Sequence, residues 1–174
     1  MSKVGHNEFL IPIKGLSTGK HKYTFLLDTQ FFGKFDNSLV SEADLTADIV
    51  LEKQPLWIGV SGKVKGEVVT ECDRCLDELK IPLNTDVKLI VKFARTEGEE
   101  DNDEVMILEP GEAELDLEQF FYDYVCLSLP LQRVHPQGEC NSEMEKKLET
   151  LSYRVVDKES SQDSPFGKLK DLLN

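Results

Sequence analysis

Two cysteines separated by two residues, Cys72 and Cys75, are the part of this sequence best suited to chemistry. They lie in the stretch ECDRCLDE, with acidic residues on both sides and Arg74 between them. Such a pair can be a redox dithiol, one half of a metal site, or two core residues. The two-residue gap favours metal binding sterically, because it lets both sulfur atoms face one ion.

A zinc site needs further ligands, and the sequence offers a second pair. His135 and Cys140 lie in RVHPQGEC, where the proline and the glycine allow the backbone to turn. Zinc prefers four Cys and His ligands that come as two pairs from separate loops. The four candidate ligands of one structural zinc are therefore Cys72, Cys75, His135 and Cys140. Spacing alone favours this site no more than two free thiols and an ordinary loop histidine.

The redox interpretation is the weaker one. A thioredoxin-like pair lies at the start of a helix, which lowers the thiol pKa, whereas LDELKIPL after the pair predicts a turn into a strand. The carboxylates of Glu71, Asp73 and Asp77 disfavour a thiolate, and only Arg74 favours it. Cys126 lies in an apolar helical pattern and is expected to be a buried small side chain. No other catalytic motif is present, so the sequence predicts no enzyme.

Composition narrows the class of partner. The chain has 174 residues, a formal net charge of -13 and 40% hydrophobic residues. An acidic chain is poorly suited to sequence-blind binding of nucleic acid, although a local basic patch remains compatible with it. It suits a basic partner such as a ribosomal protein. We find no secretion signal and no apolar run of the ~20 residues that span a membrane, so we expect a cytoplasmic protein with reduced thiols and no membrane contact.

The elements that position these residues predict an α+β fold. Apolar residues alternate through most of the first two-thirds, which is typical of antiparallel strands buried on one face. The cysteine pair falls at the turn between two such strands. Helices are expected after the acidic loop at 96–104, the first beginning at Asp116 with Gln119 as capping partner. We expect residues 1–154 to form one domain that contains the cysteine turn.

Residues 155–174 are predicted to be a flexible linker followed by a short C-terminal helix. Such a helix would carry an apolar side and two lysines, which makes it a candidate partner-binding element. The alternative is that it caps the protein's own core. The candidate residues are Phe166, Lys168, Leu169, Lys170, Leu172 and Leu173.

Three segments taken together resemble the YceD family of large-subunit ribosomal RNA accumulation proteins. They are VVTECDRCLDEL, LEQFFYDYVCLSLPLQRVHPQGEC and SPFGKLKDLL. The matching positions are Cys72, Arg74 and Cys75 in the turn, then Leu127, Leu129, Pro130, His135 and Cys140, and finally Pro165 and Phe166. Some members carry extra cysteines after the LxLP segment, whereas this chain has Cys140 and His135 there.

The resemblance implies a non-enzymatic role in the accumulation of large-subunit ribosomal RNA, through ribosome assembly. The partner would be a basic ribosomal protein or an assembly intermediate, and direct contact with RNA is left open. Two alternatives from other classes stand beside it. One is a thiol oxidoreductase that uses Cys72 and Cys75, and the other is a zinc-stabilised binding module unrelated to ribosomes.

Overall fold

The computed structural model describes residues 8–93, 104–109 and 111–156, which divide into two compact units. Among the described residues, unit 1 comprises 8–71 and 78–133, and unit 2 comprises 72–77 and 134–156. The chain thus leaves unit 1 for one short loop, returns to it, and leaves it again after Arg133.

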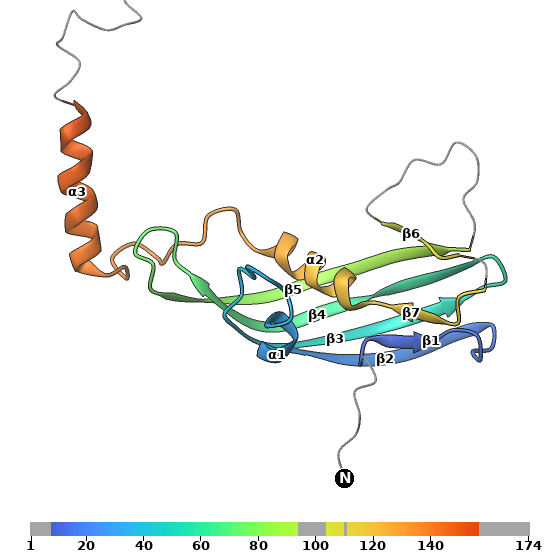
Figure 1. Cartoon of the computed structure of the whole chain (residues 1–174). Helices are drawn as coiled ribbons and strands as arrows, with labels where there is room; N and C mark the ends of the chain where they lie inside the picture. Colours follow the sequence, from blue (N-terminus) through green and yellow to red (C-terminus); the bar gives the residue numbers. More distant parts are fainter. Residues whose placement is uncertain (1–7, 94–103, 110, 157–174) are drawn as a thin grey trace, which may run out of the picture. The chain divides into compact units, whose positions relative to one another are not determined.

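Unit 1 is built on a five-stranded sheet with the strand order β2-β3-β4-β5-β6 (Figure 1). Neighbouring strands are antiparallel except β6, which pairs in parallel with β5. The sheet strands are β2 (Gly19–Asp28), β3 (Glu42–Lys53), β4 (Trp57–Glu71), β5 (Glu78–Lys92) and β6 (Val105–Ile107). A second, two-stranded sheet pairs β1 (Leu10–Pro12) with β7 (Glu114–Asp116). The helices are α1 (Thr29–Phe32), α2 (Glu118–Ser128) and α3 (Ser142–Val156), of which α3 belongs to unit 2.

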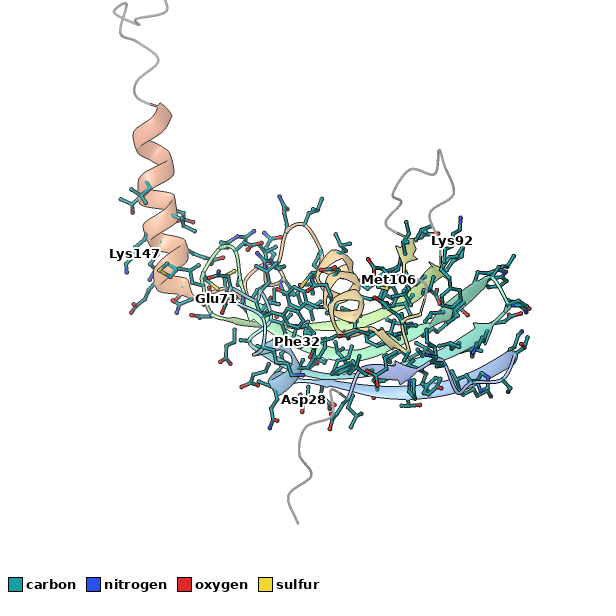
Figure 2. The ribbon with its side chains drawn as sticks, turned by 45° about the vertical axis from the view of Figure 1, so that its right-hand side comes forward. Asp28, Phe32, Glu71, Lys92, Met106 and Lys147 are labelled. Atoms are coloured by element: carbon teal, nitrogen blue, oxygen red, sulfur yellow. The ribbon has the colours of Figure 1, made fainter. Side chains whose placement is uncertain are left out.

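One face of the sheet carries the core. Along β3 the apolar residues alternate with polar ones, so every second side chain is buried. Helix α2 packs on that face, where Phe121 is fully buried against the rings of Phe9 and Phe25. Phe32 of α1, labelled in Figure 2, is 1% exposed in the same core. On the opposite face of the sheet most side chains are exposed or half-buried.

Two glycines let β3 and β4 approach closely. An ideal Cβ atom on Gly62 would lie 2.1 Å from the carbonyl oxygen of Asp48, and one on Gly66 would lie 2.0 Å from that of Asp44. Gly66 also has a φ of +143°, which L-residues rarely adopt. Only glycine fits at these two positions of the central strand pair.

The predicted α+β fold, with antiparallel strands first and the longer helices later, is confirmed. The expected start of the first long helix was wrong, because α2 begins at Glu118 and Asp116 is the last residue of β7. Pairing of Asp116 with Leu10 draws this segment into a strand. The Asp116 carboxylate still accepts a hydrogen bond of 2.8 Å from the backbone N–H of Glu118.

Two further expectations concern chain ends and membranes. The predicted division into 1–154 and 155–174 stays a prediction, because residues 157–174 lie outside the described residues. Within the described part of the chain, none of the helices combines the length and the apolar character needed to cross a membrane.

Candidate metal centre

The loop between β4 and β5 brings the first two cysteines together. It follows Glu71, the last residue of β4 and labelled in Figure 2. The backbone N–H of Cys72 donates to the carbonyl oxygen of Asp77 at 2.9 Å, and that of Leu76 donates to the carbonyl oxygen of Cys72 at 2.9 Å. Leu76 has a φ of 66°, in the left-handed region. These two bonds close the loop into a tight knuckle that carries Cys72 and Cys75.

The second pair of ligands comes from the segment 134–141. A turn closes it, since the backbone N–H of Glu139 donates to the carbonyl oxygen of Pro136 at 3.0 Å and Gly138 has a φ of 87°. The Asn141 side-chain amide then donates to the Asp77 carboxylate at 3.2 Å. This bond ties the end of the segment to the knuckle within unit 2.

Four side chains converge between the knuckle and this segment: Cys72, Cys75, His135 and Cys140, here called the Cys3His cluster. Their ligand atoms all lie within 4.8 Å of one another. The Sγ atoms of Cys72 and Cys140 are 3.9 Å apart, and His135 Nδ1 lies 3.4 Å from Cys75 Sγ and 3.9 Å from Cys140 Sγ.

These separations fit the edges of a zinc coordination tetrahedron. Ligand bonds of about 2.3 Å to sulfur and about 2.0–2.1 Å to nitrogen give S–S edges of about 3.8 Å and S–N edges of about 3.6 Å. The S–S separation is 3.9 Å, and the two S–N separations are 3.4 and 3.9 Å. The cluster could therefore hold a metal ion such as zinc.

The surroundings of Cys72 favour its thiolate, which is the form that binds a metal cation. Burial opposes ionisation of Cys72, but the backbone N–H groups of Cys75, Arg74 and His135 outweigh it and bring the pKa of the thiol to about 6. Burial, followed by the neighbouring Cys75 and Cys72 thiols, raises the pKa of Cys140 to about 11. A divalent cation reverses this second effect, because it stabilises several thiolates at once.

Unit 2 has almost nothing else to hold it together. Its buried residues, among those the structure describes, are the three thiols Cys72, Cys75 and Cys140. Helix α3 carries no buried residue over its first ten positions, and Leu148 and Leu151 are exposed. A small unit that lacks an apolar core usually needs a metal or disulfides for its order.

The structure thus brings together all four residues predicted as metal ligands. Cys126 lies outside the Cys3His cluster and is half-buried on α2, so it is less buried than expected. The predicted partner-binding residues from Phe166 to Leu173 lie outside the described residues.

Arg74 contacts more groups at the site than its position in the sequence indicated. Its Nη1 atom lies 4.0 Å from Cys140 Sγ and 3.9 Å from the Glu145 carboxylate on α3. The CxRC spacing signals an arginine at the knuckle, but the sequence gives no sign that this arginine reaches the second ligand pair. Arg74 therefore connects the knuckle, the segment 134–141 and α3 within unit 2.

Comparison with known proteins identifies the family. The family model for the large ribosomal RNA subunit accumulation protein YceD matches residues 60–173. No curated protein and no solved structure gives a significant match. The chain belongs to the YceD family, and membership implies a role in the accumulation of large-subunit ribosomal RNA.

Proposed function

We propose that this protein is a cytoplasmic, non-enzymatic assembly factor that supports the accumulation of large-subunit ribosomal RNA. The observation that supports this most directly is the family match, which covers residues 60–173 and begins within β4. The factor acts by binding a basic ribosomal protein or an assembly intermediate. A formal net charge of -13 favours such a partner electrostatically.

The Cys3His cluster holds one structural zinc in this proposal. Four protein ligands fill the tetrahedral positions of zinc, so no position is left for a substrate or an activated water molecule. The metal closes unit 2 by joining the knuckle to the segment 134–141. Its role is to order the surface that follows, including the start of α3.

The rival function, thiol oxidoreductase, has one observation in its favour, the lowered pKa of Cys72. Access argues against it, because Cys72 is 0% exposed and Cys75 is 2% exposed. A nucleophilic thiolate must reach the disulfide of another protein. Backbone N–H groups that stabilise a buried thiolate serve a metal ligand equally well.

The C-terminal segment is the proposed recruiting element. Its apolar residues Phe166, Leu169, Leu172 and Leu173 would enter a groove on the partner, and Lys168 and Lys170 would line the rim. Removing 165–174 tests this assignment. Unchanged melting of the protein together with loss of binding to ribosomal precursors supports it. A sharp fall in the melting temperature assigns the segment to the protein's own core instead.

The experiment that tests the function compares cells with and without this protein. We expect its loss to lower large-subunit RNA relative to small-subunit RNA and to accumulate assembly intermediates, most clearly in the cold. A tagged pull-down from growing cells identifies the bound proteins and RNA. Normal subunit profiles at all temperatures, with zinc still bound to the purified protein, would favour the zinc-stabilised module unrelated to ribosomes.

A further inference from the structure

The sheet face that turns away from the core is divided into a basic half and an acidic half. In the strand register, Lys22 and Lys88 lie at the two ends of one outward-facing row, and Lys63 and Lys65 lie in the next two rows. The basic half carries Lys20, Lys22, Trp57, Lys63, Lys65, Lys88, Ile90 and Lys92, together with the carboxylates of Asp48, Glu52 and Asp86. The acidic half carries Asp28, Glu42, Asp44 and Glu67, together with Lys80.

A lysine-rich surface is unusual on a chain as acidic as this one. Six lysines stand against four carboxylates in the basic half, including Glu104 at its edge beside Lys88, although the whole protein has a formal net charge of -13. Lysine-rich patches on acidic proteins attract polyanions locally, because the field beyond about 10 Å is screened at 0.1 M salt. The basic half is therefore able to bind an anionic polymer that the rest of the surface repels.

An aromatic ring lies on this half of the face. The indole of Trp57 lies against Gly59, where an ideal Cβ atom would come within 2.8 Å of the ring. The ring thus occupies the space that a side chain at position 59 would need, and glycine leaves that space open. Trp57 is 39% exposed, so part of the ring stays open to solvent. Its cross-strand neighbour is Lys92, labelled in Figure 2 at the end of β5.

The carboxylates on the basic half hold the lysines only weakly. Lys63 pairs with Asp86 at 2.9 Å, and both side chains are more than half exposed. Lys20 pairs with Glu52 at 3.8 Å, and Lys88 pairs with Glu104 at 3.6 Å. Exposed pairs of this kind contribute about 0–1 kcal/mol. A phosphate group can replace the carboxylate at little cost.

We propose that the basic half of the sheet face binds single-stranded RNA, with one base stacked on Trp57 and the phosphates contacted by the lysines. An open aromatic ring within a lysine-rich surface is the combination that single-stranded nucleic acid needs, since unpaired bases stack and the backbone is neutralised. The inference rests on the proposed function in one respect only, because that function makes ribosomal RNA the natural source of the strand.

The fluorescence of Trp57 can report RNA binding directly, because Trp57 is the single tryptophan of the chain. We would titrate the full-length protein with a 12-nucleotide oligouridine and follow indole fluorescence, with the anisotropy of a labelled oligonucleotide as second readout. Stacking is expected to quench the fluorescence. The same sequence presented as a duplex with its complement should bind more weakly and without quenching, since its bases are already stacked.

Three variants separate stacking from charge. Trp57→Ala should weaken oligouridine binding by about 5- to 150-fold, the range for one stacked base, and Trp57→Phe should recover part of it. Lys63→Ala combined with Lys65→Ala should reduce the slope of log affinity against log salt by about 0.7 for each phosphate that a lysine no longer neutralises. Lys80→Ala, on the acidic half of the same face, is the matched control and should bind like the wild type.

Several results would overturn the proposal. They are an absence of quenching, equal affinity for the duplex, or equal losses in the Lys80 control and the basic-half variants. RNA affinity that survives Trp57→Ala, while a ribosomal protein disappears from pull-downs, makes the face a protein-docking surface. Failure of this inference is distinguishable from failure of the proposed function. Wild-type oligouridine affinity of Trp57→Ala, in a protein whose loss still lowers large-subunit RNA, refutes this inference alone, whereas RNA binding by a protein whose loss changes no subunit profile refutes the function alone.

Discussion

Replacing Cys72 by serine is expected to release the metal and to disorder part of unit 2. The oxygen of serine is a poor zinc ligand at neutral pH, because the hydroxyl stays protonated. Three ligands would remain, and the site would lose the one thiol whose pKa the nearby backbone N–H groups lower to about 6. We expect about one zinc per wild-type chain and close to none per Cys72→Ser chain.

The size of the effect follows from how little else orders the segment 134–141. Fixing the backbone of these eight residues costs about 8–16 kcal/mol, at about 1–2 kcal/mol per residue. Burying the Cys140 thiol, the one buried side chain among residues 134–141, returns about 1 kcal/mol. Without zinc the ordered segment is therefore unfavourable by about 7–15 kcal/mol. Zinc bound by a structural site contributes about 10–16 kcal/mol, which offsets this cost.

Elemental analysis of protein purified in reducing buffer gives the zinc content, and hydrogen exchange gives the local order. Amides of the knuckle and of 134–141 should lose their protection in Cys72→Ser, while those of β3 and α2 keep theirs because unit 1 has its own core. Cys126→Ser is the matched control, since Cys126 lies outside the cluster. Full zinc content in Cys72→Ser, or a wild-type protein that is metal-free and equally protected, would refute the metal centre.

Three other predictions follow from particular backbone and titrating groups. Leu76→Gly should bind zinc more tightly than Leu76→Val in competition with a chelator, because a φ of 66° suits glycine and excludes a β-branched residue. Gly62→Ala should lower the free energy of unfolding in urea by about 3 kcal/mol, since its Cβ atom would meet the backbone of β3, whereas Gly15→Ala, with open space around it, should change it by less than about 0.5 kcal/mol. Stability should fall as pH rises above about 9–10, because burial raises the pKa of Tyr122 in the folded protein, so the unfolded chain loses its proton first; Tyr122→Phe should make this fall less steep.

Much of the fold could be predicted because the period of two is strong along β2 to β5. Each of these strands buries alternate residues on one face, and that regularity is local information. The short strands β1 and β7 could not be predicted as partners. Their pairing joins Leu10 to Asp116, more than a hundred residues away, and depends on the completed core. The same pairing explains why α2 starts later than its capping signal indicates.

The four candidate metal ligands that the structure brings together could be predicted from residue type and spacing, because few side chains bind zinc and two pairs were present. What could not be predicted was their context. Nothing in the sequence shows that Arg74 reaches Cys140, or that the described part of unit 2 buries little besides its thiols. Likewise, the lysines of the basic half are scattered over β2, β4 and β5, and only the register of the sheet places them beside one another.

The two proposed sites belong to different units, and this separation makes them independent. The RNA surface is built on β2 to β5, whose order depends on the core of unit 1. The metal centre depends on ligands that all lie in unit 2. Removal of zinc should therefore leave the quenching of Trp57 by oligouridine unchanged, and Trp57→Ala should leave the zinc content unchanged. If both proposals hold, RNA binds the sheet of unit 1 through a surface that does not depend on the metal of unit 2, so each site can be removed without the other.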